Sequence, residues 1–96
     1  MTERVDESLR ICMNVAQSLF GKRMQTNVVE YPYSLHLQIR ERGAETWLVG
    51  IAFTVSDVDL NLFDFAVYDR TQTKLHSGSG MGELNAYITK SGWHKN

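Results

Sequence analysis

The chain has few residues that form disulfide bonds or interrupt helices and strands: one cysteine and one proline among its 96 residues. The lone Cys12 cannot form an internal disulfide, which indicates a reducing compartment. Its apolar runs are far shorter than the roughly 20 residues that a membrane helix needs. The acidic residues Glu3, Asp6 and Glu7 are the opposite of a basic signal-peptide start. We therefore expect a cytoplasmic protein with no membrane segment.

An excess of charge of either sign is also missing, because ten basic and eleven acidic side chains give a net charge of −1. This balance provides no chain-wide attraction for nucleic acid or anionic membranes, so any such binding would need a local patch. The composition, 43% hydrophobic and 22% charged, is typical of a globular protein. A chain of this length predicts a single domain over residues 1–96.

The first segment has the apolar spacing of an amphipathic helix over about residues 3–20. Thr2 is the expected N-cap, and Gly21 is the expected C-terminal stop. The apolar stripe consists of Val5, Leu9, Cys12, Val15, Ala16, Leu19 and Phe20.

After Met24 the period changes to two, which predicts an antiparallel sheet over about residues 27–76. Turns are expected at 41–45, at 56–59 and at Asp69, with a short first strand over 27–31 and a weaker last strand over 71–76. The odd-numbered residues form the predicted core face: Tyr33, Leu35, Leu37, Ile39, Trp47, Val49, Ile51, Phe53, Val55, Phe63, Phe65 and Val67.

A second helical stripe predicts a C-terminal helix over about residues 81–90, with Ser79 or Ser77 as its cap and Gly92 at its end. Its apolar positions are Met81, Leu84, Tyr87 and Ile88. Residues 93–96 form a tail expected to be mobile, unless Trp93 folds back onto the core. The predicted fold is α+β in two layers, order α-β-β-β-β-α, with a meander of four to five strands and both helices on one face.

The glycine-rich segment Ser77–Gly82 lies between the last predicted strand and the second helix. Such a loop can bind an anion through free backbone N–H groups. The segment lacks the lysine and hydroxyl residue of a P-loop and does not belong to a βαβ unit. We interpret it as a flexible connector, with anion binding as the alternative.

The acidic residues Asp57 and Asp59 alternate with apolar ones, as at the start of an EF-hand loop. That loop requires glycine at its sixth position and glutamate at its twelfth, where this chain has Leu62 and Tyr68. We therefore interpret the two aspartates as turn residues.

Catalytic and metal-binding patterns are weak throughout. His36, His76 and His94 lie on different segments, and none has a cysteine or carboxylate at ligand spacing. No nucleophile elbow accompanies the serines. The sequence therefore predicts a protein that is not an enzyme and uses no metal or cofactor.

The order of elements, with glycines before the second helix, resembles that of double-stranded RNA-binding domains. In that family a basic cluster at the start of the second helix grips phosphates, whereas this chain has Met81-Gly82-Glu83-Leu84-Asn85. The strand segment is also longer than the resemblance implies. Nucleic-acid binding therefore stays an alternative.

The even-numbered face of the sheet remains as the candidate binding surface. Small residues flanked by leucine and tyrosine would make a partly apolar platform, which monomers seldom expose over a large area. Asp64 would need a partner such as Arg40, or an arginine from another chain, if the platform is covered. The predicted partner-binding residues are His36, Gln38, Arg40, Leu48, Ala52, Leu62, Asp64 and Tyr68. The alternative is a solvated face without a partner.

These observations predict a small protein-binding module that acts by occupying a surface of a larger protein. One hypothesis is an inhibitor of a host-defence or toxin system, encoded by a phage or mobile element. The alternatives are a nucleic-acid-binding domain and a structural subunit that only forms homodimers or larger oligomers.

Overall fold

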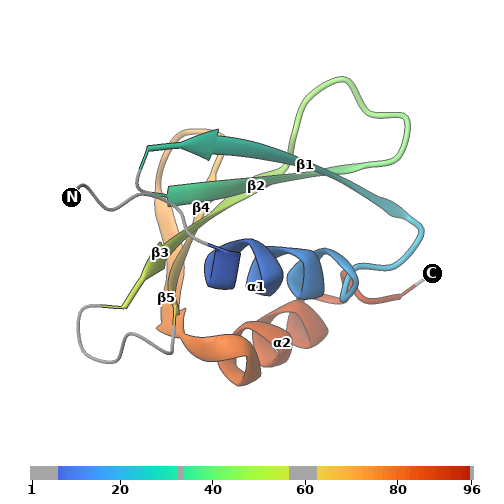
Figure 1. Cartoon of the computed structure of the whole chain (residues 1–96). Helices are drawn as coiled ribbons and strands as arrows, with labels where there is room; N and C mark the ends of the chain where they lie inside the picture. Colours follow the sequence, from blue (N-terminus) through green and yellow to red (C-terminus); the bar gives the residue numbers. More distant parts are fainter. Residues whose placement is uncertain (1–6, 33, 57–62, 96) are drawn as a thin grey trace.

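A computed structural model describes residues 7–32, 34–56 and 63–95 of the chain. The elements are α1 (Glu7–Gln17), β1 (Met24–Tyr31), β2 (Ser34–Glu41), β3 (Val49–Val55), β4 (Phe63–Asp69), β5 (Lys74–Ser79) and α2 (Gly80–Ser91). The strands form one antiparallel sheet in the order β1-β2-β3-β4-β5, and both helices cover the same face of it (Figure 1). The predicted α+β meander is confirmed, with five strands.

The core lies between this face of the sheet and the two helices. Leu37 of β2, Ile51 of β3 and Val67 of β4 are opposite one another in the sheet and are fully buried. Their neighbours two positions along each strand are buried as well, except Asp69 at the end of β4, and this pattern confirms the alternation read from the sequence. The helices contribute Leu9, Met13, Ala16, Leu84 and Ile88.

The first helix ends earlier than predicted, since the last residue of α1 is Gln17 and not residue 20. The N–H of Leu19 donates to the carbonyl of Ala16, and the N–H of Phe20 donates to that of Gln17. These three-residue steps tighten the chain into a turn, as is common at the end of a helix. The predicted start at residue 3 and the Thr2 cap lie outside the described residues.

The predicted apolar stripe of this helix is partly wrong. Val15 is 44% exposed beside the exposed Ile11, whereas Met13, which was not placed in the stripe, is buried. At about 100° per residue, Met13 and Ala16 fall close to Leu9, one on each side of it, so all three face inward, whereas Val15 falls on the outward side.

Two strand boundaries also differ from the prediction. β1 begins at Met24, whose side chain is buried. β5 is displaced toward the C-terminus, so the expected flexible Ser77–Gly82 connector does not exist: its first half ends β5 and its second half begins α2. A direct turn from strand to helix is possible because Gly80 has a φ of 85°, which only glycine adopts at little cost.

The connection between β2 and β3 is longer than the predicted turn and includes residues 42–48. Trp47 was predicted on the core face but lies in this connection, and its ring is over Gly50 on the opposite face. Strand alternation does not apply to a residue outside the strand, which explains the error. The expected turn at 56–59 falls mostly on residues that are not described.

The C-terminal segment folds back, as the sequence allowed. Gly92 ends α2 with a φ of 81°, and its N–H donates to the carbonyls of Ile88 and Thr89. The carbonyl of Trp93 accepts a hydrogen bond of 2.8 Å from the N–H of Gly21. The Trp93 ring stacks on Phe20, so this part of the tail belongs to the packed structure.

Within the described part of the chain, neither helix has the length and apolar character needed to cross a membrane.

Candidate functional site

The sheet face turned away from both helices, called the open face below, is the candidate site. The register places His36, Ala52, Ala66 and Ser77 in one row across four strands. The next row consists of Gln38, Gly50, Tyr68 and Lys74. The small residues of β3 and β4 lie at the centre of these rows, so the middle of the face is low and its margins are high.

The first depression of the open face, called the aromatic hollow, has a volume of about 520 Å³. Gly50 and Ala52 lie in the middle of its lining, and rings surround them. Two of these rings, Tyr31 and His36, are tilted against each other with centroids 4.5 Å apart. The described residues that line it are Tyr31, His36, Gln38, Trp47, Gly50, Ala52, Tyr68 and Gln72.

Among the described residues, no aspartate, glutamate, lysine or arginine lines the aromatic hollow. Its polar groups are the amides of Gln38 and Gln72, the imidazole of His36 and the tyrosine hydroxyls. Burial lowers the pKa of His36 below its ordinary value of 6.5, because a desolvated imidazole resists the positive charge. The hollow is therefore suited to uncharged groups.

A second depression, called the polar hollow, has a volume of about 680 Å³ and lies toward β5. The Ser79 hydroxyl donates a 2.6 Å hydrogen bond to Oδ1 of Asp64 there. Ala52 and Tyr68 line both hollows, so the two are neighbours on one continuous face. Its lining within the described part of the chain is Ala52, Thr54, Ser56, Asp64, Phe65, Ala66, Tyr68, Lys74, Ser77, Gly78 and Ser79.

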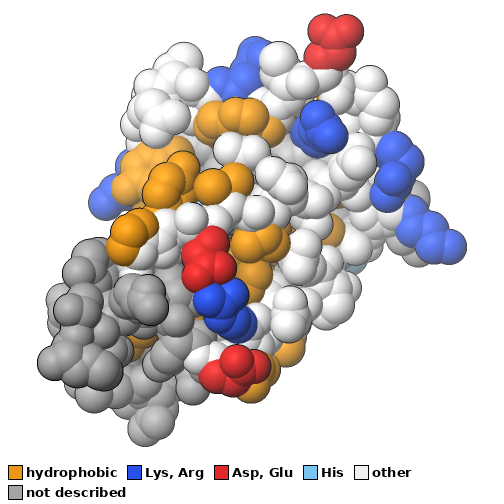
Figure 2. Space-filling view, turned by 45° about the horizontal axis from the view of Figure 1, so that its top comes forward, with side chains coloured by type: hydrophobic (Ala, Val, Ile, Leu, Met, Phe, Trp, Pro, Cys, Tyr) orange, Lys and Arg blue, Asp and Glu red, His pale blue; other side chains and the backbone are white. Residues whose placement is uncertain are grey.

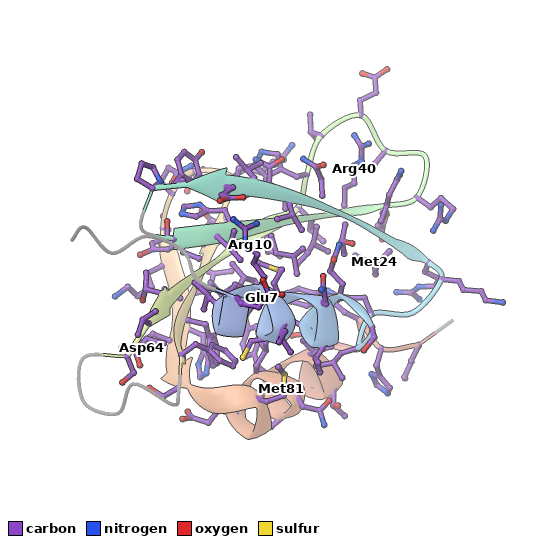
Figure 3. The ribbon with its side chains drawn as sticks, in the orientation of Figure 1. Glu7, Arg10, Met24, Arg40, Asp64 and Met81 are labelled. Atoms are coloured by element: carbon purple, nitrogen blue, oxygen red, sulfur yellow. The ribbon has the colours of Figure 1, made fainter. Side chains whose placement is uncertain are left out.

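The suggested pairing of Asp64 with Arg40 is wrong. Asp64 lies opposite Thr54 and Ser79, whereas Arg40 lies opposite Gln25 near the other end of β2. Figure 3 shows the two labelled side chains at opposite ends of the molecule. Ser79 is instead the partner of Asp64.

The eight predicted partner-binding residues divide into three groups. Leu48 lies in the connection 42–48 and is 44% exposed. Leu62 lies outside the described residues. The other six share the open face as predicted: His36, Gln38, Arg40, Ala52, Asp64 and Tyr68.

The sequence did not predict Trp47, Tyr31 or Gln72 in the site, although all three line the aromatic hollow. Gln72 lies in the turn between β4 and β5 and has a φ of 70°. Tyr31 is the last residue of the edge strand β1. The sequence does not show how β1 pairs with β2, so it does not show on which face of the sheet Tyr31 lies. Of these three residues, only Trp47 is noticeable in the sequence as a possible site residue, because it is a large aromatic residue next to a predicted turn.

The remaining candidates have structural roles. Oδ1 of Asp69 accepts hydrogen bonds from the side chain and N–H of Thr71 and from the N–H of Thr73, which confirms the predicted turn. These hydrogen bonds lower the pKa of Asp69, and the bond from the Thr71 hydroxyl has the largest effect. His76 stacks on Tyr87 with centroids 4.6 Å apart.

Metal binding has no support within the described ranges, where no three His, Cys, Asp or Glu side chains come close enough to hold an ion. The Asp57 and Asp59 turn lies outside those ranges. Positive side chains in Figure 2 are spread around the visible surface and do not form one patch.

No protein-family model, curated protein or solved structure matches this chain. The geometry of the open face is therefore the best indication of function.

Proposed function

We propose that the protein is a small binding module that holds an uncharged, apolar or aromatic part of a partner protein on its open face. The aromatic hollow supports this proposal, because rings surround a floor of Gly50 and Ala52. Tyrosine and tryptophan give large contact areas with few rotatable bonds, and they are enriched at the energetic centres of interfaces.

The chemistry of the hollow favours a protein partner. Its volume of about 520 Å³ is in the usual range for a binding pocket, and its lining combines rings with a few amides. Such a site can bury one apolar side chain while Gln38 or Gln72 bonds the adjacent backbone. The polar hollow, reached across Ala52 and Tyr68, extends the same contact toward β5.

Nucleic acid is the less favoured partner. Phosphate binding draws its affinity from clustered lysine and arginine, but here the net charge is −1 and the visible basic side chains are dispersed. The first turn of α2 contains Glu83, whose carboxylate already accepts the N–H of Ser79. The resemblance to double-stranded RNA-binding domains therefore lacks its main source of affinity.

A module of this kind acts by covering a surface of its partner. This mode of action is the one that the sequence suggested for an inhibitor of a host-defence or toxin system, and we retain that role as part of the proposal.

Two arginine substitutions test the proposal. Ala52 lines both hollows, so Ala52→Arg fills them without changing the buried face. Ala86→Arg is the matched control, since Ala86 is exposed on α2. Purified proteins would be used as baits against extract of the native cells and of their hosts. We expect one partner protein that is captured by the wild type and by Ala86→Arg, and lost with Ala52→Arg.

Equal capture by both variants would refute the open face as the site. Circular dichroism checks that Ala52→Arg is folded. If it is not, Trp47→Ala replaces it, because Trp47 lies outside the strands. Capture that disappears with nuclease and with added salt would instead support the nucleic-acid alternative.

A further inference from the structure

The two edges of the sheet differ in how far they are protected against pairing with another strand. β5 has a register shift opposite Val67 and Tyr68, so it carries a bulge, and it begins with Lys74. The N–H of Ser79 donates to Glu83 and is already used. Bulges and lysines are the usual devices that protect an edge.

β1 has none of these devices. All eight of its residues pair with β2 without a register shift, and none is proline, glycine, lysine or arginine. β1 is the edge strand of the sheet, and Figure 1 shows no described helix or strand beside its outer edge. A regular strand in this position is a template for a further strand.

The direction of the backbone groups of β1 follows from one hydrogen bond. The N–H of Arg42 donates to the carbonyl of Arg23 at 2.9 Å, which makes this a hydrogen-bonded pair. Pairs alternate along an antiparallel ladder, so the N–H and C=O groups of Thr26 and Val28 point away from β2. No described residue pairs with these outward backbone groups.

We propose that β1 binds β1 of a second copy of this chain, antiparallel, so that the two sheets become continuous. The charges of β1 favour this occupant. Its sequence contains a single charged residue, Glu30, and Arg10 holds that carboxylate through bonds of 2.9 and 2.6 Å. Two such strands therefore meet without an uncompensated charge on either side.

The register centred on Val28 fits best. It places Val28, which is 38% exposed, against Val28 of the second copy, and Thr26 against Glu30 of that copy. The outward N–H and C=O groups of the two Val28 residues then face each other, as hydrogen bonding requires. The two Glu30 residues stay four positions apart along the strands, or roughly 13 Å at about 3.4 Å per residue.

This dimer goes beyond the proposed function and does not depend on it. A two-fold axis perpendicular to the joined sheet keeps both helix layers on one side and both open faces on the other. One partner with two sites, or two adjacent partners, would then be bound with increased avidity.

A lysine pair tests the edge. Val28→Lys places two positive charges across the two-fold axis, and Val15→Lys makes the same change at an exposed position of α1. The molar mass of the purified full chain would be measured by analytical ultracentrifugation over a range of concentrations. We expect the wild type and Val15→Lys to approach twice 11.0 kDa, and the dissociation constant of Val28→Lys to rise at least about tenfold.

A second measurement tests the register. In a Cys12→Ser background, Val28→Cys should form a disulfide between copies on oxidation, because opposed residues of a hydrogen-bonded pair have Cα atoms about 5.5 Å apart. Val15→Cys should remain monomeric on a non-reducing gel.

A wild type that stays monomeric near millimolar concentration would refute the proposal, as would a dimer equally weakened by Val15→Lys and Val28→Lys. A dimer lost in Ala52→Arg and kept in Val28→Lys would move the contact to the open face. A monomeric chain whose β1 captures a different protein, sensitive to Val28→Lys, would overturn the second copy as the occupant.

Discussion

The ring of Trp47 lies over Gly50: a Cβ atom at residue 50 would be 3.6 Å from Cζ3 of the indole. This is ordinary van der Waals contact, so glycine is not required here by space. The contact joins a residue of the connection 42–48 to the centre of β3 and closes one side of the aromatic hollow.

The first prediction follows from this contact. Gly50→Ala should raise the free energy of unfolding by about 0.5–1 kcal/mol, because alanine loses less backbone entropy and gains contact with the ring. Gly43→Ala should lower it by about 1 kcal/mol, since Gly43 has a φ of 92°. Urea denaturation of both variants measures the difference. Changes of the same sign would contradict this account of the two glycines.

A second pair of glycines tests the junction of β5 and α2. A Cβ atom at Gly78 would lie 2.6 Å from Oε2 of Glu83 and 3.1 Å from the buried ring of Phe65. Gly78→Ala should therefore cost about 1–3 kcal/mol through overpacking and displacement of Glu83. Gly82→Ala meets nothing within 4 Å and should stabilise α2 by up to about 1 kcal/mol. Thermal unfolding of the two variants should shift in opposite directions.

The third prediction concerns the packing of the C-terminal tail. A Cβ atom at Gly21 would lie 2.0 Å from the carbonyl oxygen of Lys95, so Gly21→Ala must displace the backbone of the tail. The hydrogen bond from Gly21 to Trp93 and the stacking of Trp93 on Phe20 would both be weakened. We expect a loss of about 1–3 kcal/mol and a red-shifted Trp93 emission in a Trp47→Phe background.

Truncation after Gly92 provides the control for this prediction. If the clash with the tail is the cause, Gly21→Ala should cost much less in the truncated protein than in the full chain. An equal cost in both backgrounds would show that the effect arises elsewhere.

The fold could be predicted because one face of the sheet is buried. In β2, β3 and β4 a shift by one residue would expose the core residues around Leu37, Ile51 and Val67, so the alternation determines which side chains face the helices. The ends of the elements are less constrained. Gly80 was interpreted as part of a loop because its sequence does not reveal that a single left-handed residue joins β5 directly to α2.

The candidate site was predictable only as a face. Ala52 and Tyr68 follow from the same alternation as the core. The aromatic hollow also needs Trp47 from one connection and Gln72 from another, and their meeting on one face is a property of the tertiary structure. The partner of Asp64 was missed for the same reason, because Ser79 lies on a strand whose position the sequence did not determine.

The last prediction concerns pH. Burial lowers the pKa of His36 in the folded state below 6.5, so between the two pKa values the unfolded chain binds more protons than the folded one. Stability should therefore fall as the pH drops through 6.5 and level off below the folded-state pKa. A partner that covers the aromatic hollow would desolvate His36 further and lower its pKa again, so binding should weaken as the pH falls below the pKa of the free folded protein. NMR titration of the His36 ring, free and bound, measures both effects, and His36→Gln should remove them. A His36 pKa above 6.5, or one raised by the partner, would mean that the imidazole meets a negative charge there instead of an uncharged group.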